Sequence, residues 1–427
     1  MRIIADLHIH SHLSRACSPQ LRPENLYEWC QLKGITTLAT GDFTHPAWFA
    51  ELREKLVEAD PGLFALKPSL AASVDSRVVS SCRAPVRFVL GVEISCIYKK
   101  GPRVRKVHHL VFMPSFEAAE RFNASLAKIG NIRSDGRPIL GLDSRNLLEL
   151  VLKADPQAVL IPAHAWTPHF AVFGSQSGFD SLQECFEDLT PHIFAIETGL
   201  SSDPAMNWRL SALDGITLIS NSDAHSPEKL AREANVFDTE LSYTGIFDAI
   251  RSRDGRFLKT LEFFPEEGKY HVDGHRNCRT RLDPKETLRR NGLCPACGKP
   301  VTVGVLHRVE RLADRAAAAQ PSGSPDFDHL IPLKEVLGQV LRVGPTSVKV
   351  DALYRRLLES FGNELFVLRE LPLANLEPEH PLVALALDHM RRGNVRIDAG
   401  YDGEYGTISL LSEADFTSRR QMALFDA

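Results

Sequence analysis

Short hydrophobic runs alternate with segments of helical periodicity along roughly the first 265 residues of the chain. The hydrophobic runs have the length of β-strands, and we predict strands at residues 2–10, 36–42, 87–95, 107–113, 158–166, 193–199 and 217–223. Helical patterns lie between them at residues 23–33, 47–58, 115–129 and 144–154. This alternation predicts an α/β fold built on parallel strands.

Each predicted strand ends at a polar or ionisable side chain. In barrels of parallel strands, functional groups collect where the strands end and the loops begin. We therefore expect these side chains to converge on one mouth of the fold. They are His8, His10, Asp42, Glu93, His108, His164, Glu197, Asp223 and His225.

The types of these side chains indicate a metal site. His8 and His10 lie two residues apart, so on a strand both point to the same face, and the same argument groups Asp223 with His225. Imidazole nitrogens and carboxylate oxygens are ligands for Zn, Mn and Fe. Burying so many ionisable groups is costly unless something compensates their charge, and metal ions do so.

Composition narrows the class of protein. The chain has 427 residues, 44% of them hydrophobic and 24% charged, and a net charge of −4. No overall positive field attracts nucleic acid, so any such binding must use local basic patches. No run is long enough to span a bilayer and no signal peptide is evident, so we expect a cytoplasmic protein without a membrane partner.

Three of the eight cysteines lie close together in a short basic segment. His275 and Cys278 form one pair of ligand type, and Cys294 and Cys297 form a second pair fifteen residues later. Two such pairs predict a closed, tetrahedral structural zinc site. His271 is an alternative fourth ligand with a less natural spacing. The arginines around the site suit either contact with a phosphate backbone or simple solvation.

The rest of the chain is predicted to be mainly helical, with a loop at residues 317–329 and a hairpin around residues 400–406. We expect four parts in total. They are a catalytic domain at residues 1–265, a zinc-binding segment at 266–310, a mainly helical domain at 311–420 and a tail at 421–427.

Two features near the predicted mouth suit nucleic acid. Residues 99–106 contain five cations, namely Lys99, Lys100, Arg103, Arg105 and Lys106. The loop after His164 carries aromatic residues, of which Trp166 and Phe173 are candidates to stack on an extruded base. Ordinary packing of a long loop is the alternative for these aromatic rings.

The motifs DLHIHS, TGDFTH, GVEIS, VHHL, PAHAW and SNSDAH resemble, in order, those of the PHP superfamily of phosphoesterases. The resemblance implies a distorted (β/α)7 barrel with up to three divalent metals (Zn, Mn, Mg or Fe). It assigns His8, His10, Glu93 and Asp223 to one metal, and Glu93 with His108 and His164 to a second. It assigns Asp42 and His225 to a third metal, which His45 or His12 completes. Either His108 or His109 is the ligand, and strand alternation lets only one face the site.

Longer strings resemble one branch of this superfamily, the endonuclease Q family. They include DFTHPAWF, NSDAHSPEKLAREAN, GKYHVDGHRNC, CPACGKP and GVLHRVERLADR. The resemblance implies hydrolysis of DNA on the 5′ side of deaminated bases (uracil, hypoxanthine, xanthine) and of abasic sites. Glu93 and Asp223 are the predicted catalytic carboxylates, and Glu197 either orients a ligand or contacts the substrate.

Two other functions remain open at this point. One is a small-molecule phosphatase of the histidinol-phosphate type, and the other is a non-catalytic module that associates with DNA or a sliding clamp. Gln421, Leu424 and Phe425 in the terminal QMALFDA resemble the short motif with which bacterial repair proteins bind the sliding clamp. A motif this short also occurs by chance.

Overall fold

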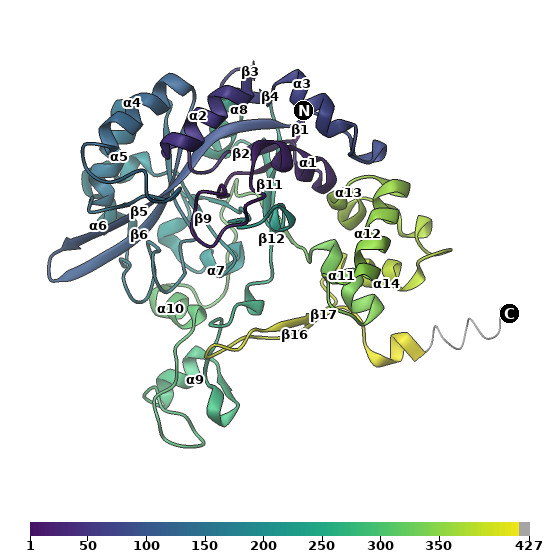
Figure 1. Cartoon of the computed structure of the whole chain (residues 1–427). Coiled ribbons are helices and arrows are strands. Elements are labelled where there is room, and N and C mark those ends of the chain that lie inside the picture. Colours follow the sequence, from purple (N-terminus) through teal and green to yellow (C-terminus); the bar gives the residue numbers. More distant parts are fainter. Residues whose placement is uncertain (418–427) are drawn as a thin grey trace.

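A computed structural model describes residues 1–417 of the chain (Figure 1). The predicted clamp motif, with Gln421, Leu424 and Phe425, lies outside the described residues, so its role stays a prediction. Within residues 1–417, no helix is long and apolar enough to cross a membrane.

A mixed eleven-stranded sheet organises the described part of the chain. Its strands are β1 (Arg2–Asp6), β2 (Thr37–Ala39), β3 (Leu56–Asp60), β4 (Leu63–Leu66), β5 (Arg87–Lys100), β6 (Arg103–Met113), β7 (Ile139–Leu140), β8 (Val159–Pro162), β11 (Ala234–Asp238), β12 (Phe257–Glu262) and β15 (Asp326–His329). A separate parallel pair, β9 (Ala195–Glu197) and β10 (Thr217–Ile219), continues the arrangement beside β8. The predicted α/β class is confirmed, whereas closure as a seven-stranded barrel stays a prediction.

Not all of the strands are parallel as we predicted. β1, β2 and β5 pair in parallel, but β6 is antiparallel to both β5 and β8. The cause is the connection between β5 and β6, which consists only of Gly101 and Pro102. Two residues can join antiparallel strands, whereas parallel strands need a long crossover. The result is a long hairpin that projects from the body of the molecule (Figure 1).

The register of this hairpin decides which residues face the mouth. Ser95 lies opposite His108, and Glu93 lies opposite Leu110, so all four share one face of the hairpin. His109 lies opposite Ile94 and therefore points to the other face. This arrangement brings Glu93 and His108 together diagonally across the two strands.

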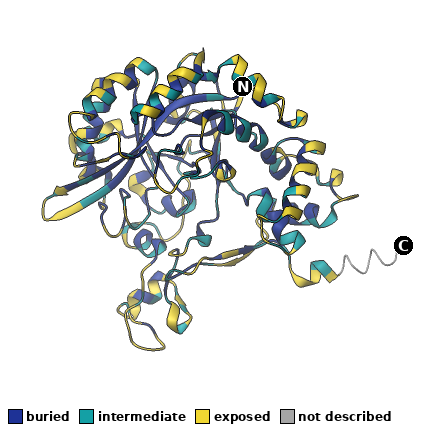
Figure 2. Cartoon of the chain, viewed as in Figure 1, coloured by how far each residue is buried: buried dark blue, intermediate teal, exposed yellow. Residues whose placement is uncertain are grey.

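Helices cover the sheet, and four of them lie at the segments where we predicted helical patterns, residues 23–33, 47–58, 115–129 and 144–154. They are α1 (Pro23–Lys33), α2 (Pro46–Lys55), α3 (Pro68–Asp75), α4 (Phe116–Leu126), α5 (Ser144–Ala154), α6 (Leu182–Phe186), α7 (Pro204–Asn207) and α8 (Tyr243–Ser252). Side-chain caps fix five of their starts. Ser115, for example, accepts from the Ala118 amide, and Asp143 accepts from the Arg145 amide. The helix predicted at 47–58 ends earlier, because Leu56 begins β3. Figure 2 shows buried residues along the sheet and exposed ones on the outer helix faces.

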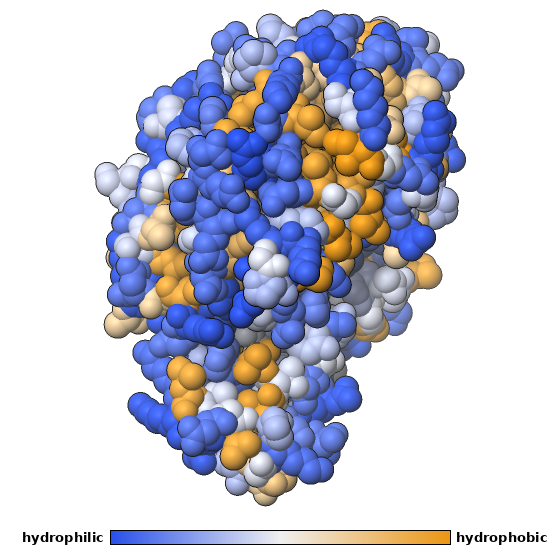
Figure 3. All heavy atoms as spheres, turned by 90° about the vertical axis from the view of Figure 1, so that its left-hand side faces the viewer, coloured by the Kyte–Doolittle hydropathy of each residue, from blue (hydrophilic) through white to orange (hydrophobic). Residues whose placement is uncertain are grey.

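The cysteine segment forms a small lobe below the main body (Figure 1). It contains β13 (Asp273–His275), β14 (Thr280–Leu282) and α9 (Pro284–Arg289), and α10 (Val305–Leu312) leads back to the main body. Figure 3 shows the lobe at the lower end of that view, with hydrophobic side chains among hydrophilic ones. Leu288 and Leu293 are among its exposed hydrophobic residues.

The last part of the described chain is mainly helical. Its elements are α11 (Leu333–Leu341), α12 (Val348–Phe361), α13 (Glu364–Arg369), α14 (Pro381–Arg391) and the antiparallel pair β16 (Arg396–Asp398) and β17 (Thr407–Ser409). The antiparallel pair confirms the hairpin expected around residues 400–406. β15 precedes these helices and pairs with β12, so part of residues 311–420 belongs to the main sheet. The four-part division of the chain stays a prediction.

Candidate active site and metal centres

Two groups of metal-type ligands lie side by side where the strands end. The first group is His8, His10 and Asp223, and its ligand atoms lie within 4.8 Å of one another. His8 and His10 follow β1, and His10 Nε2 lies 3.1 Å from Asp223 Oδ1. A parallel bridge between Ile9 and Ala224 holds the two segments together. Both histidines are buried.

The second group is Glu93, His108 and His164. Glu93 Oε1 lies 2.6 Å from His108 Nδ1 and 2.9 Å from His164 Nε2. His109 is fully buried, and its Nε2 lies 2.8 Å from the Ser144 hydroxyl on the other face of β6. Of the two alternatives, His108 is therefore the one that faces the site.

Glu93 connects the two groups. Besides its contacts with the second group, its Oε2 lies 3.5 Å from His10 Nε2 and its Oε1 lies 3.8 Å from His8 Nε2. One carboxylate therefore approaches four imidazoles, two from each group. Carboxylates can use both oxygens as ligands, so Glu93 is suited to bridge two metal ions.

Glu197 is fully buried and lies behind His8, away from solvent. Its two carboxylate oxygens lie 3.0 and 3.1 Å from His8 Nδ1. It also accepts hydrogen bonds from the Asn221 side chain (2.9 Å) and the His164 amide (2.7 Å). This environment fits the orienting role of Glu197 and leaves no exposed surface for a substrate contact.

The buried Nε2 atom of His8 indicates that this group of residues can hold a metal ion. Within residues 1–417, His8 Nε2 is buried and has no hydrogen-bond partner. Glu197 accepts from His8 Nδ1, so once Nε2 has given up its proton, the lone pair on Nε2 is free to bind a metal ion. An unpaired buried nitrogen is costly without such a partner.

The residues predicted for a third metal are more dispersed. Asp42 Oδ2 accepts hydrogen bonds from the Ser11 amide and hydroxyl and from the Ser14 hydroxyl, and Asp42 Oδ1 lies 3.3 Å from His10 Nδ1. The His225 ring packs against His10, with 4.7 Å between the ring centroids.

His45 and His12, the two alternatives for the remaining ligand of the third metal, lie outside both groups. His45 Nε2 donates to the Arg133 carbonyl at 2.9 Å, and the ring of His12 packs edge-on against Trp48. The structure thus brings Asp42 and His225 next to the first group but leaves His45 and His12 apart. The third metal stays a prediction.

The backbone is strained at three ligand positions. Asp42, His164 and Asp223 have positive φ angles of 50°, 27° and 46°, which residues other than glycine rarely adopt. Strain of this kind costs on the order of 1–3 kcal/mol per residue and is typical of functional sites. Gly199 allows the turn at His164, because a Cβ atom at position 199 would lie 2.5 Å from the His164 Cβ.

The carboxylate of Asp223 is ionised. Burial raises the pKa of Asp223, but the charges of His8 and His10 outweigh it and hold that pKa below its usual range. Burial lowers the pKa of His10, yet hydrogen bonds to Asp223 and Asp42 raise it overall to about 9. In His108 burial prevails over the nearby Glu93 and lowers the pKa to about 4. Ionised carboxylates and a neutral His108 are the forms that bind metal ions.

The four predicted zinc ligands also come together. His275, Cys278, Cys294 and Cys297 place one ligand atom each within 4.8 Å of the others. His271 is buried elsewhere and is not part of this group. Burial raises the pKa of Cys294, but backbone N–H groups of Ala296 and Cys297 outweigh it and lower the pKa to about 6. A thiolate at neutral pH is ready to bind a metal ion.

The basic hairpin places its five cations in different environments. Lys100 pairs with Glu187 at 2.7 Å, Arg105 bonds to the Gly178 carbonyl, and Lys106 lies over the Phe170 ring. Lys99 and Arg103 are exposed at the tip.

Trp166 and Phe173 are both buried, at 1% and 2% exposure, and their rings pack together with 5.0 Å between centroids. The Trp166 ring nitrogen donates to the Asn207 side chain at 2.7 Å. The two rings are part of the packing beneath the loop. This corrects the expectation that they form a stacking platform for an extruded base.

Arg137 is a site residue that the sequence pattern did not reveal. Its Nη1 lies 2.9 Å from Glu93 Oε2. Arg137 belongs to a loop, not to a predicted strand end, and the contact spans 44 positions. No local periodicity marks such a residue.

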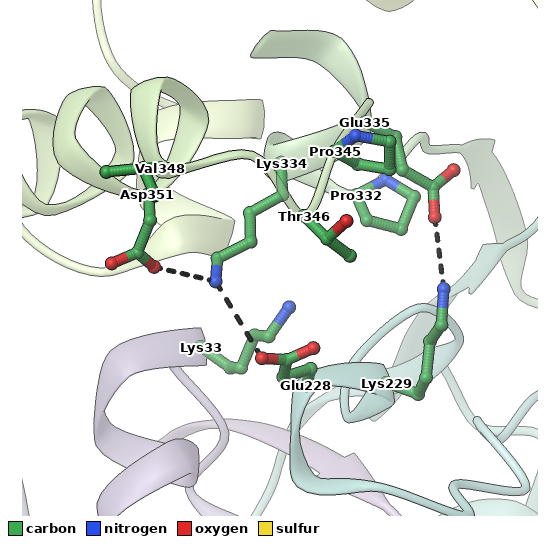
Figure 4. Close-up of a pocket in the computed structure, with 10 residues that line it drawn as sticks. All are labelled: Lys33, Glu228, Lys229, Pro332, Lys334, Glu335, Pro345, Thr346, Val348 and Asp351. Atoms are coloured by element: carbon green, nitrogen blue, oxygen red, sulfur yellow. Dashed lines mark hydrogen bonds and ion pairs between the residues drawn. The ribbon is translucent and has the colours of Figure 1, made fainter. Parts of the chain in front are cut away.

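Figure 4 shows a cavity of about 360 Å³ between α1 and the helices α11 and α12. Carboxylates neutralise its lysines, since Lys334 lies 3.0 Å from Asp351 and Lys229 lies 3.2 Å from Glu335. None of the metal-type ligands described above lines this cavity. The strand-end groups are therefore the candidate site.

Comparisons with known proteins agree with this geometry. Residues 332–394 match the family described as the MJ0043 C-terminal domain. The uncharacterized protein YqxK of Bacillus subtilis is 30% identical over 95% of this chain and 99% of its own length. The uncharacterized protein MJ0043 of Methanocaldococcus jannaschii is 32% identical over 58% of this chain, which spans 31% of that longer protein.

Two solved structures match almost the whole chain. The lesion-specific endonuclease PfuEndoQ from Pyrococcus furiosus has 31% sequence identity and a TM-score of 0.83, over 98% of this chain and 99% of that one. Endonuclease Q in complex with a 27-mer duplex substrate, which carries an abasic lesion at the active site, has 31% identity and a TM-score of 0.81 over 97% and 98%. With this similarity over both full lengths, the chain belongs to the endonuclease Q family, which confirms the prediction of an enzyme of the nuclease class.

Proposed function

We propose that this protein is a DNA repair endonuclease that hydrolyses the phosphodiester bond on the 5′ side of deaminated bases and abasic sites. The bases we propose are uracil, hypoxanthine and xanthine. The coarser statement, a lesion-specific DNA endonuclease, is supported by the endonuclease Q structures, one of which holds a duplex with an abasic lesion. The preference for particular bases rests on the sequence resemblance.

One observation carries the proposal, namely the position of Glu93 between two groups of ligands. Its oxygens lie 2.6 and 2.9 Å from histidines of the second group and 3.5 Å from His10 of the first. We propose that His8, His10 and Asp223 hold one divalent metal and that His108 and His164 hold another, with Glu93 shared. Two neighbouring metal ions supply a nucleophilic water at neutral pH and neutralise charge on a phosphate.

The chain's own residues prepare the site for this chemistry. Glu197 holds the proton of His8 on Nδ1 and so keeps Nε2 directed into the site. Asp42 and His225 flank His10 and are the proposed ligands of a third metal. The strained backbone at Asp42, His164 and Asp223 fixes the ligands before the substrate binds.

We propose a structural role for the cysteine site. All four positions of a tetrahedral zinc would be filled by His275, Cys278, Cys294 and Cys297, so no position remains for a substrate. The lobe it stabilises is rich in arginine and is a proposed contact for the DNA backbone.

The test uses purified full-length protein, duplex DNA with one uracil, hypoxanthine or abasic site, and added Mn²⁺, Mg²⁺ or Zn²⁺. We expect a single nick on the 5′ side of the lesion and no cleavage of an undamaged duplex. His8→Ala and Asp223→Asn should abolish nicking while DNA binding remains. The absence of nicking together with turnover of a small phosphomonoester would overturn the proposal. Normal nicking by both variants would overturn the metal assignment.

A further inference from the structure

Arg137 is the cation that reaches the acidic centre of the site. Within residues 1–417, it is the one Arg or Lys that forms an ion pair with any of the four site carboxylates, Asp42, Glu93, Glu197 and Asp223. The Nη1 atom contacts Glu93 Oε2 at 2.9 Å. The side chain keeps 27% of its surface exposed, whereas Glu93 has none. The guanidinium therefore lies between the buried ligands and the open side of the site.

The loop that carries Arg137 is held on both sides. Before it, the Gly136 amide donates to the Leu13 carbonyl at 3.1 Å, and a Cβ atom at position 136 would lie 2.2 Å from Asp42 Oδ2. After it, the Pro138 carbonyl accepts from the Ser95 amide at 3.0 Å, and β7 pairs with β5 immediately beyond. Only glycine permits this approach to Asp42. The position of Arg137 is thus fixed by the backbone and not by chance contact of a long side chain.

We propose that Arg137 is a catalytic residue that binds the scissile phosphate of the substrate. This inference rests on the proposed function of the site. A guanidinium has five N–H donors in a planar fork and pairs with phosphate oxygens in a bidentate manner. One N–H donates to Glu93, and within residues 1–417 the other guanidinium N–H groups donate to no protein acceptor. Its donors would stabilise the charge that develops on the non-bridging oxygens during hydrolysis.

The charge balance at the site supports a phosphate partner for Arg137. If Glu93 is shared between two metal ions, its negative charge is largely neutralised by them. The guanidinium then needs another anion, and a phosphodiester is the anion that the proposed reaction brings to this place. A lysine would supply the charge but not the fork.

The first experiment measures cleavage rates of an abasic duplex by the wild type and by Arg137→Gln, Arg137→Lys and Arg133→Ala. Arg133 is an exposed arginine in the same loop, so its variant controls for loss of charge. We expect Arg137→Gln to lower kcat by about 10²–10³-fold, as for removal of one transition-state donor, and Arg137→Lys to recover part of it. Arg133→Ala should keep the wild-type kcat. A wild-type kcat in Arg137→Gln would overturn the inference.

The second experiment measures binding of the DNA duplex in the absence of cleavage. Affinities are compared, with Ca²⁺ in place of the activating metal ion, for an abasic duplex and for the same duplex with a neutral methylphosphonate at the scissile position. The wild type should bind the charged duplex several-fold more tightly, and Arg137→Gln should lose that difference while Arg133→Ala keeps it. An unchanged difference in Arg137→Gln would overturn the inference.

The bound-metal content of the variants shows whether Arg137 contacts the phosphate or only supports the metal ligand Glu93. Arg137→Gln should retain the metal content of the wild type, and loss of metal would show that Arg137 only supports Glu93. If the wild type itself does not cut DNA, the proposed function fails, whereas the binding comparison still tests Arg137.

Discussion

Both carboxylate oxygens of Glu197 lie within 3.1 Å of His8 Nδ1, and the His8 Nε2 atom on the opposite side of the ring is buried without a hydrogen-bond partner among residues 1–417. The two ends of this imidazole therefore have different roles. Nδ1 is bonded to the protein, and Nε2 is directed at Glu93 and Asp223, at 3.8 and 3.5 Å. A carboxylate behind a histidine in this way raises the basicity of the ligand and fixes its orientation.

We predict that Glu197→Ala lowers the affinity of the site for divalent metals by about 10–100-fold, because His8 loses the group that fixes its proton and its orientation. Glu197→Gln should have a smaller effect, since an amide oxygen still accepts from Nδ1. Metal titration by calorimetry measures the change. Glu233→Gln is the control, since Glu233 is equally buried but its hydrogen-bond partner is the Phe263 amide. Equal metal affinity of Glu197→Ala and the control would refute the orienting role.

A second prediction concerns the cysteine group. Cys294→Ser should remove one equivalent of zinc, because a hydroxyl is a far weaker zinc ligand than a thiolate. The metals of the strand-end site should remain, since their ligands come from other segments. Elemental analysis counts the metals, and limited proteolysis reports whether residues 266–310 have loosened.

The half-buried Cys17 lies outside the cysteine group, so Cys17→Ser serves as the matched control. It should keep the full zinc content. If both variants hold the same zinc as the wild type, the assignment of Cys294 is wrong.

A third prediction concerns the tip of the basic hairpin. Arg103 is exposed there, and we expect Arg103→Ala to weaken binding of damaged and undamaged duplexes alike. The slope of log affinity against log salt should fall by about 1 for each lost phosphate contact. Fluorescence anisotropy over a range of salt concentrations measures it. Arg256→Ala is the control, since that arginine pairs with Asp254 at 2.8 Å. A selective loss for the damaged duplex alone would contradict a backbone contact.

Much of the candidate site follows from local sequence patterns. Strand alternation places His8 beside His10 and lets only one of His108 and His109 face the site, and the structure shows that it is His108. The pairing of His275 with three cysteines follows from ligand spacing in the same way. These predictions depend only on neighbouring positions along the chain.

Features set by distant contacts were missed. The short Gly101–Pro102 connection that reverses β6 is an exception, because it is a local turn signal that we did not interpret as a hairpin. Burial of Trp166 depends on Asn207, which is 41 positions away, so sequence alone does not distinguish a packed ring from an exposed one. Arg137 reaches Glu93 because its loop is anchored to Leu13 and Ser95. Tertiary contacts of this kind leave no periodic signal.

The fourth prediction is a pH dependence that originates at Glu262. This carboxyl is fully buried, and its Oε2 accepts hydrogen bonds from the hydroxyls of Thr198 and Ser220, each at 3.1 Å. Burial raises the pKa of Glu262 from 4.5 to about 7. The folded protein therefore holds this proton more tightly than the unfolded chain does. The associated stability is fully present below pH 4.5 and is lost as the pH rises through about 7.

At about 1.4 kcal/mol per pKa unit, this loss is on the order of 3 kcal/mol. Glu262→Gln has no proton to lose, so its stability relative to the wild type should rise between pH 5 and pH 8. Urea denaturation at several pH values measures the difference. Glu379→Gln, at an exposed glutamate, should follow the wild-type profile at every pH. Parallel profiles for Glu262→Gln and the wild type would show that Glu262 is not protonated in the folded protein, because only a carboxyl that keeps its proton on folding produces the predicted divergence.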